Sequence, residues 1–493
     1  MMKTDHKHSA PPGRAPRGAA AGAVALAAAA LLLSGCSLAP AYQRPDAPVA
    51  GTYPAVPPAA GGSGGLAPAG KPATDTGWRE FFTDTRLQQL IATALDYNRD
   101  LRTAALRIEE ARAAYNIQSA DRLPNLNGTL GGSRARTPRS VSATGQEITS
   151  TRFDAGLAVS SFELDFFGRV KSLNDAALAT YLASDEARQA AQISVVAEVA
   201  KAYFTERAFA EQYRLAQQTY EARARTYKLT QQRVDVGASS RLDLRSNETL
   251  METARVAALT LARQRAQAEN ALTLLVGQAP AADSAAAGAM ASDAAIDAMS
   301  AVPEGLPSEL LARRPDIRAA EQRLMAANAN IGAARAAFFP RISLTAAIGS
   351  SSPEFSGLFD SGTGSWSFVP QLVLPIFDAG RNRANLNLSE VRKNIAVADY
   401  EKTIQTAFRE VADALAARTY LGDQVAAQRA VQDAQADRLK LLQLRFENGV
   451  ASSLDVLDAQ RELFSAEQSL VQARLLRTTS AIDLYRALGG GLK

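Results

Sequence analysis

RRPDIRAAEQRL, at residues 313–324, repeats the pattern of YNRDLRTAALRI at residues 97–108, with Asp316 in the place of Asp100. The two stretches are 216 residues apart. Further positions match at a nearly equal distance of 212 residues, so two constant offsets cover most of the chain. Self-similarity of this kind indicates an internal duplication. The pairs that share the second offset are EVAKA (198–202) with EVADA (410–414), Gly237 with Gly449, and Asp243 with Asp455.

The duplication predicts how the chain is divided. The four-residue change of offset falls between Pro124 and Gly168, where an insertion in a loop is tolerated. A low-complexity stretch separates the two copies. The predicted segments are a first repeat at residues 78–277 with strands near 125–165, a linker at 278–305, and a second repeat at 306–489 with strands near 341–376.

Each repeat contains one long stretch without proline, Arg169 to Arg233 and Arg381 to Arg445. Apolar residues at a spacing of three and four, such as Val196, Val199 and Tyr203, place one stripe on one helix face. At ~1.5 Å per residue such a helix is about 100 Å long. The sequence therefore predicts long helices in coiled-coil packing, which makes the fold mainly α-helical.

The period changes to two between these helices. Apolar and polar residues alternate in four segments, which predicts two β-hairpins with Gly/Ser-rich tips at residues 131–151 and 349–365. Segments of about ten residues with this alternation are typical of transmembrane β-strands. Four strands cannot close a barrel, and an open edge in lipid leaves backbone groups without partners. Closure therefore requires several chains. The four segments are 126–133, 153–161, 342–348 and 366–374.

The amino terminus has the features of an export signal. Four basic residues precede an Ala/Leu run at residues 19–33, and Leu33-Ser34-Gly35-Cys36 follows. The stretch resembles a bacterial lipoprotein signal, in which residues 1–35 are removed and the cysteine is acylated, here with palmitate or a related chain. Residues 36–77, rich in Pro, Ala, Gly and Ser, then form an extended tether. Cleavage removes four cations and one anion and lowers the net charge from +4 to +1.

The rare reactive residues exclude most enzyme chemistry. The chain has two histidines, His6 and His8, which lie in the predicted signal, and one cysteine, Cys36, which would become the acylated first residue, so the mature chain would have no imidazole and no free thiol. Serine-histidine and cysteine-histidine catalysis and the usual zinc sites all require such residues. We therefore expect no enzymatic activity, no metal and no cofactor apart from the covalent lipid on Cys36. The small net charge also argues against a nucleic-acid partner.

Five strings in order along the chain identify a family resemblance. They resemble the TolC/OprM-like outer-membrane factors, and in particular the lipidated efflux branch of NodT type. The resemblance extends from Cys36 to about Gly489. The strings are CSLAPAYQRP (36–45), FELDFFGRV (162–170), RRPDIRAAEQRL (313–324) with ARAAFFPRISL (334–344), LPIFDAGRNRAN (374–385) and NGVASSLDVLDAQR (448–461).

The resemblance implies a homotrimer whose three chains close a twelve-stranded barrel in the outer membrane. Duplicated helices would form a coiled-coil tube across the periplasm, lipid-anchored at the outer membrane. The tube would dock on a periplasmic adaptor and an inner-membrane pump, and it would act as the exit duct for drugs or other small toxic molecules, conferring multidrug resistance. Two alternatives remain open: an exit duct for type I protein secretion, and a periplasmic coiled-coil lipoprotein that forms no channel.

Glycines break the long helices at Gly237 and Gly449, and each is followed by serine and aspartate, which are typical of a helix start. We therefore predict helix-turn-helix tips, which would contact the adaptor. Asp243 is expected to cap its helix and take part in that contact. Simple turn chemistry explains these tip residues equally well.

The second tip is followed by Leu454, Asp455, Asp458 and Arg461. Asp455 and Asp458 share a helix face, and in a three-fold tube they would form a carboxylate ring, with an apolar ring from Leu454. The resemblance implies that Leu454 and Asp458 form the narrowest point of a periplasmic aperture and that Arg461 forms a restraining ion pair. The alternative is that the aspartates only stabilise the helix dipole or form surface pairs.

Overall fold

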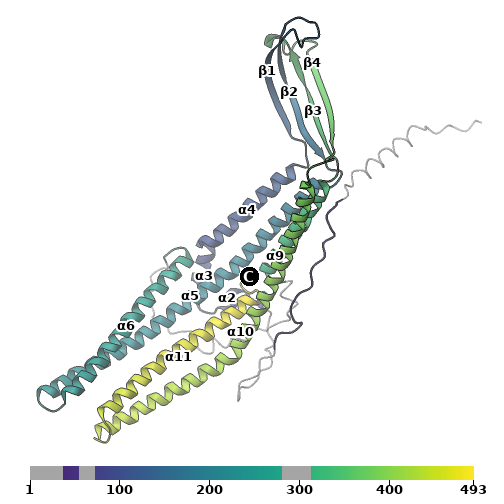
Figure 1. Ribbon diagram of the computed structural model, residues 1–493. Coiled ribbons are helices and arrows are strands. Elements are labelled where there is room, and N and C mark those ends of the chain that lie inside the picture. The colour runs from purple at the N-terminus through teal and green to yellow at the C-terminus, as the bar shows by residue number, and fades with distance from the viewer. Residues whose placement is uncertain (1–36, 55–72, 280–312, 493) are drawn as a thin grey trace, which may run out of the picture. The chain divides into compact units, whose positions relative to one another are not determined.

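The computed structural model describes residues 37–54, 73–279 and 313–492. Cys36, the predicted signal and most of the predicted linker lie outside the described residues. In the described part the chain forms two compact units. One unit includes Ala113–Leu178 and Met325–Asn394 with residues up to Gln43, and the other includes Arg44–Arg112, Ala179–Leu324 and Ile395–Lys493. Figure 1 labels the helices and strands of the described residues.

The same order of elements occurs twice along the chain. In each copy a helix of 22 residues precedes two strands, and a helix of 67 residues follows them. The first copy contains α4 (Arg99–Ala120), β1 (Leu126–Thr137), β2 (Ile148–Leu164), α5 (Arg169–Asp235) and α6 (Arg241–Val276). The second contains α9 (Pro315–Ala336), β3 (Arg341–Ser352), β4 (Gly364–Val373), α10 (Arg381–Glu447) and α11 (Ser453–Ala487). Three short elements precede the first copy: η1 (Ala73–Asp75), α2 (Trp78–Phe81) and α3 (Thr85–Tyr97). One more, η2 (Phe355–Gly357), lies between β3 and β4.

The predicted fold class is confirmed in the elements that one chain supplies: long paired helices and four strands. The helices α5 and α10 begin at the predicted residues and extend two residues beyond the predicted ends. No helix in residues 37–54, 73–279 or 313–492 combines the length and the apolar character that crossing a bilayer requires.

The first unit contains one antiparallel sheet in the order β1-β2-β3-β4. The central pair, β2 with β3, joins the two copies, and β1 and β4 are the edges. Residues that face one another across the ladders lie on one face of a sheet. One face is apolar: Leu126 pairs with Val159, Leu157 with Ile348, and Ile348 with Trp366. The opposite face carries Asn127, Ala158, Ala347 and Ser367 at neighbouring positions.

The strands are longer than the sequence predicted. We predicted tips at 131–151 and 349–365, but β1 continues to Thr137, β2 begins at Ile148, β3 ends at Ser352 and β4 begins at Gly364. The connections are therefore residues 138–147 and 353–363. Glycine and serine in these stretches suggested turns, yet the ladder hydrogen bonds use only the backbone and continue through them.

A β-bulge between Val159 and Phe162 shifts the register of β2 against β3, so the side chains after the bulge exchange faces. Ser161 lies in the left-handed region with φ 51°. The bulge places Phe162 opposite Leu344, on the apolar face, and Glu163 opposite Ser343, on the polar face. Glu163 there forms ion pairs with Arg169 at 2.7 Å and Arg341 at 3.2 Å.

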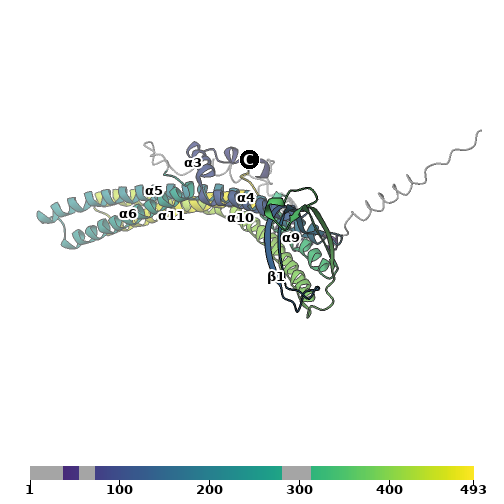
Figure 2. The ribbon, with the colours of Figure 1, turned by 90° about the horizontal axis from the view of Figure 1, so that it is seen from above.

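The second unit is built from paired long helices. Its segments of α5, α6, α10 and α11 run side by side in Figures 1 and 2. The predicted apolar stripe is buried at Val196, Val199 and Tyr203. Near the end of α11, Tyr485 stacks on Phe81 with ring centroids 3.9 Å apart. This end of the helices therefore forms a packed core.

Candidate functional site

The helix tips of the second unit are built alike in both copies. At each tip a glycine has positive φ, 75° at Gly237 and 74° at Gly449. The following amide donates back to the helix, from Ala238 to the Arg233 carbonyl at 2.7 Å and from Val450 to the Arg445 carbonyl at 2.9 Å. This is the usual glycine termination of a helix, and it satisfies carbonyls that the helix leaves unpaired.

We expect Gly449→Ala to destabilise the tip by about 1 kcal/mol, because the left-handed conformation is unfavourable for a residue with a Cβ. No atom lies within 4 Å of the place that an added Cβ would take at Gly449, so the cost is backbone strain and not a clash. Gly422, inside α10, is a matched control without positive φ or a nearby atom. Gly422→Ala should stabilise by about 0.5–1 kcal/mol. Thermal unfolding of both variants measures the difference, and equal effects would contradict the prediction.

Both following helices begin with a reciprocal capping box. In α6, the Asp243 amide donates to Ser240 Oγ at 3.0 Å and the Ser240 amide donates to Asp243 at 3.3 Å. In α11, the corresponding distances for Asp455 and Ser452 are 3.2 Å and 3.0 Å. The bond from Ser240 Oγ lowers the pKa of Asp243, and the bond from Ser452 Oγ lowers the pKa of Asp455. The cap predicted at Asp243 is thus present in the structure.

Acidification should open both capping boxes. Because the carboxyl pKa is lower in the folded chain, the carboxylates stabilise the caps above the ordinary value of 3.8, and this contribution is lost as the pH falls through the lowered value. Hydrogen exchange of the Ser240 and Ser452 amides, corrected for the intrinsic rate, should show constant protection from neutral pH to about pH 5 and a loss below about pH 3.8. Asp455→Asn should lose the protection at neutral pH. Protection independent of pH would contradict the assignment.

The two tips also contact each other. Ser453 Oγ at the start of α11 donates to Asp243 Oδ1 at the start of α6, at 3.3 Å. Asp243 therefore accepts from its own cap and from the other hairpin. Residues separated by 210 positions in the sequence are joined at the tips by this bond.

Asp458 connects α11 to α10. Its carboxylate accepts from Arg461 at 2.6 Å, within α11, and from Arg438 at 3.2 Å, on α10. Arg461 also pairs with Glu462 at 3.1 Å. Asp455 and Asp458, expected to share a helix face, have different partners here, since Asp455 bonds to its own cap. The ion pair of Arg461 with Asp458 is present, and the contact of Arg438 with Asp458 was not foreseen.

Leu454, in the first turn of α11, is 70% exposed. The next apolar residues, Val456 and Leu457, are buried. An exposed leucine beside charged groups provides an apolar surface that the single chain leaves uncovered.

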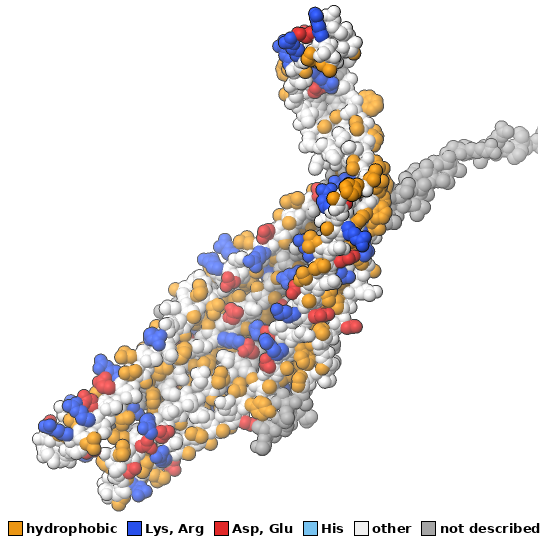
Figure 3. All heavy atoms as spheres, in the orientation of Figure 1, with side chains coloured by type: hydrophobic (Ala, Val, Ile, Leu, Met, Phe, Trp, Pro, Cys, Tyr) orange, Lys and Arg blue, Asp and Glu red, His pale blue; other side chains and the backbone are white. Residues whose placement is uncertain are grey.

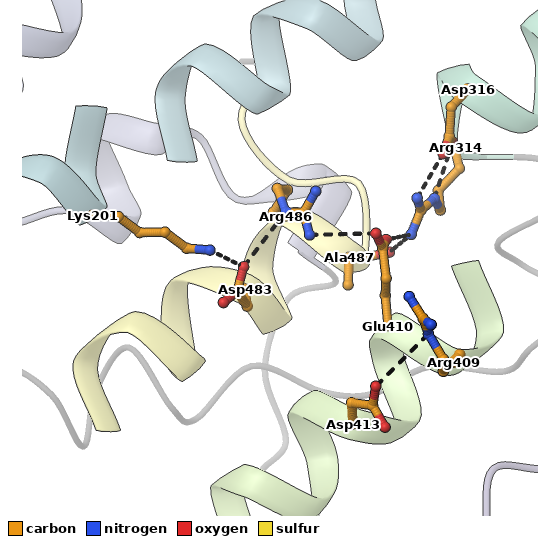
Figure 4. A network of polar contacts seen from close by, with 9 residues as sticks. All are labelled: Lys201, Arg314, Asp316, Arg409, Glu410, Asp413, Asp483, Arg486 and Ala487. Carbon is orange, nitrogen blue, oxygen red and sulfur yellow. Dashed lines mark hydrogen bonds and ion pairs between the residues drawn. The ribbon is translucent and has the colours of Figure 1, made fainter. Parts of the chain in front are cut away.

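A second polar cluster lies at the other end of α11 and was missed by sequence reasoning (Figure 4). Arg314 donates to Glu410 at 2.9 Å, to Asp316 at 2.6 Å and to the Ala487 carbonyl at 2.9 Å. Burial lowers the pKa of Arg314, but the carboxylates of Asp316 and Glu410 outweigh this effect and raise the pKa above its ordinary value. Arg314 lies in the stretch that opens the second copy, but the equivalent residue of the first copy is Asn98, so the duplication did not mark Arg314 or its partner.

Two more cations complete this cluster. Arg486 contacts Glu410 at 3.4 Å and Asp483 at 3.6 Å, and Lys201 from α5 bonds to Asp483. The groups border an open pocket of about 530 Å³. In the described ranges, no group of three or more His, Cys, Asp or Glu side chains is arranged to bind a metal ion. Paired charges of this kind connect helices.

Comparisons with known proteins were made for the whole chain. The family model described as "Outer membrane efflux protein" matches residues 90–278 and 306–490. The chain is 48% identical over 470 residues to the antibiotic efflux pump outer membrane protein ArpC of Pseudomonas putida, covering 95% of both chains. The same values hold for the toluene efflux pump outer membrane protein TtgC of that organism. The open-state structure of the Neisseria gonorrhoeae MtrE outer membrane channel has a TM-score of 0.81 at 42% identity, covering 93% of this chain and 99% of that one.

Proposed function

Because the chain belongs to the outer membrane efflux protein family, we propose that it is the outer-membrane exit duct of a tripartite efflux system for small toxic molecules. The observation that carries the proposal is the register of the sheet, which makes one face apolar and the other polar. An apolar face suits lipid and a polar face suits an aqueous lumen. The relatives ArpC and TtgC support efflux, since their names state antibiotics and toluene.

The duct is a homotrimer. One chain supplies four strands with β1 and β4 as edges, and an unpaired edge in lipid costs several kcal/mol for each unsatisfied group. Three chains close twelve strands, which is enough for an open lumen. The helices form the periplasmic tube, which docks on an adaptor and an inner-membrane pump.

The helix tips form the periplasmic aperture. Leu454 supplies an apolar ring, and Asp458 a carboxylate ring held by Arg438 and Arg461. The contact of Ser453 with Asp243 supports a closed tip, since it fastens one hairpin to the other. The turns at Gly237 and Gly449, together with Asp243, contact the adaptor.

Acylation of Cys36 anchors the chain to the outer membrane. The signal-like residues 1–35 support this proposal. Incorporation of labelled palmitate into the parent, but not into Cys36→Ser, is the expected result.

Deletion of the gene tests the proposed function. Susceptibility to antibiotics and organic solvents should rise, whereas the set of secreted proteins should stay unchanged. The purified protein should also form trimers that conduct ions in a planar bilayer. Changed secretion with unchanged susceptibility would favour a secretion duct, and trimers without conductance would contradict a channel.

A further inference from the structure

The apolar face of the sheet has the height of a bilayer core. Along β3 the face runs from Ile342 to the level of Ser352, where Phe153 lies opposite. Ten residues at ~3.3 Å each span about 33 Å, and a strand tilt of about 40° reduces this to about 25 Å along the membrane normal. The apolar band of an outer-membrane barrel has this height. The helices α4, α5, α9 and α10 all join the sheet at its other end. Phe153 therefore marks the outer edge of the band.

Two arginines follow this edge on the same face. In β1, Leu126 and Leu130 lie within the band, and Arg134 and Arg136 continue their alternation beyond it. Their partners across the ladder are Thr151 and Thr149, which carry no charge. Both arginines are exposed. The face therefore changes from apolar to cationic where the headgroups begin, and Figure 3 shows basic side chains gathered at this free end of the sheet.

The positive charge is only partly compensated. Arg136 pairs with Glu147 at 2.6 Å, although its side chain stays 69% exposed. Arg134 forms no ion pair with any residue that the structure describes, and Arg139 in the following connection adds a further cation. The acids Glu354 and Asp360 belong to the connection between β3 and β4, whose Phe355 contacts Phe153 of β2 with ring centroids 5.6 Å apart. Among the described residues neither acid forms an ion pair with these arginines. A net cationic surface thus remains on β1.

The opposite face at the same end is different. Arg152 lies on the polar face at this end of the sheet and forms an ion pair with Asp154 at 2.8 Å. This arginine is therefore neutralised within its own strand, facing the lumen. Of the strand arginines that the structure describes at this end, Arg134 is the one without an ion pair, and it lies on the lipid-facing side.

We propose that Arg134, Arg136 and Arg139 bind the phosphate groups of phosphorylated lipids in the outer leaflet. This inference rests on the proposed function, since it requires the sheet to lie in the outer membrane. Guanidinium groups bind phosphate through paired, charge-assisted hydrogen bonds. An apolar band directly below the arginines accommodates the acyl chains of the same lipid. The trimer carries three such surfaces.

Binding of lipid A tests the inference. Native mass spectrometry of the detergent-solubilised trimer, with bisphosphorylated lipid A as the probe, should show bound lipid on the parent. The double variant Arg134→Ala and Arg136→Ala should bind about tenfold more weakly, the loss expected when charge-assisted bonds to phosphate are removed. Dephosphorylated lipid A should bind parent and variant equally. Added salt should weaken binding only for the phosphorylated probe.

Two controls separate the possible causes of a loss. Arg152→Ala removes an arginine from the same end of the sheet but on the lumen face, so it should bind lipid A as the parent does. Arg134→Lys with Arg136→Lys keeps the charge and should retain most of the binding even if the alanine variant assembles poorly. Equal binding by the alanine variant, or an equal loss in Arg152→Ala, would overturn the inference. In either case conductance of the parent trimer would leave the proposed duct standing, whereas a parent without conductance would contradict the duct itself.

Discussion

Replacement of Asp458 by alanine should raise the single-channel conductance of the protein in a planar bilayer and weaken its block by divalent cations. The carboxylate accepts from Arg438 on α10 and from Arg461 on α11. Its removal therefore frees the start of α11 from α10 at the tip. It also removes one carboxylate per chain from the proposed ring, which reduces the attraction for cations.

The size of the effect follows from the exposure of these pairs. Exposed ion pairs contribute about 0.2–1 kcal/mol each, and Asp458 forms two in every chain. Only the pair with Arg438 joins the two helices, so three chains lose about 0.6–3 kcal/mol, which shifts the closed-to-open equilibrium by about threefold to about 150-fold. Asp455→Ala should add to the effect by a different route, because it removes the carboxylate that accepts from Ser452 in the capping box at the start of α11.

Glu462 offers a matched control for Asp458. It lies four residues further along α11, and it contacts Arg461. Glu462→Ala should leave the conductance close to the parent value, because Asp458 then still joins the two helices. Arg438→Ala should raise it as Asp458→Ala does. An unchanged conductance together with an unchanged cation block in Asp458→Ala would refute the aperture assigned to this residue.

Replacement of Arg314 by alanine should cause the largest loss of stability. Its side chain is 9% exposed, and its guanidinium donates to Glu410, Asp316 and the Ala487 carbonyl. Removing one partner of a buried ion pair costs about 3–5 kcal/mol, because the remaining charge stays buried without compensation. Glu410 keeps Arg486 at 3.4 Å, and the side chains of Glu410 and Asp316 are 21% and 36% exposed, so we expect a loss below that range, about 2 kcal/mol per chain. The midpoint of thermal unfolding, followed by circular dichroism in detergent, measures the loss.

The preceding residue supplies the control. Arg313 has a side chain that is 38% exposed and lies 3.6 Å from Asp75. Arg313→Ala should therefore cost less than about 1 kcal/mol, as exposed pairs do. A double-mutant cycle of Arg314→Ala with Glu410→Gln should show coupling, since the two groups are in contact. Equal losses in the two arginine variants would contradict the assigned role of Arg314.

Local sequence patterns predicted most of the architecture. Two proline-free runs predicted α5 and α10 to within two residues, because a helix needs only continuous backbone bonds and one apolar stripe. Alternation predicted the four strands, and Gly237 and Gly449 predicted the tips. The family match confirms the resemblance to outer-membrane factors. The aperture roles of Leu454, Asp455, Asp458 and Arg461, and the lipid on Cys36, stay predictions.

Strand ends were predicted less well, because Gly131 and Ser133 suggested a turn whereas backbone pairing with β2 continues to Thr137. Side-chain composition carries little information about where such a ladder ends. The bulge at Ser161 likewise could not be predicted from the sequence pattern. It follows from the pairing of β2 with β3, which requires Phe162 to face the apolar side.

The sequence by itself determined the length of the helices, the presence of the strands and the chemistry of the tips, since each of these depends on residues close together in the chain. It also determined the duplication, which is read from matching strings and needs no contact between them. Only the tertiary structure decided that Ser453 reaches Asp243, that Asp458 holds Arg438, and that Arg314 meets Glu410. These contacts join residues that are distant in the chain. Their formation depends on how the helices rotate and shift as they pack, and no local period records that choice.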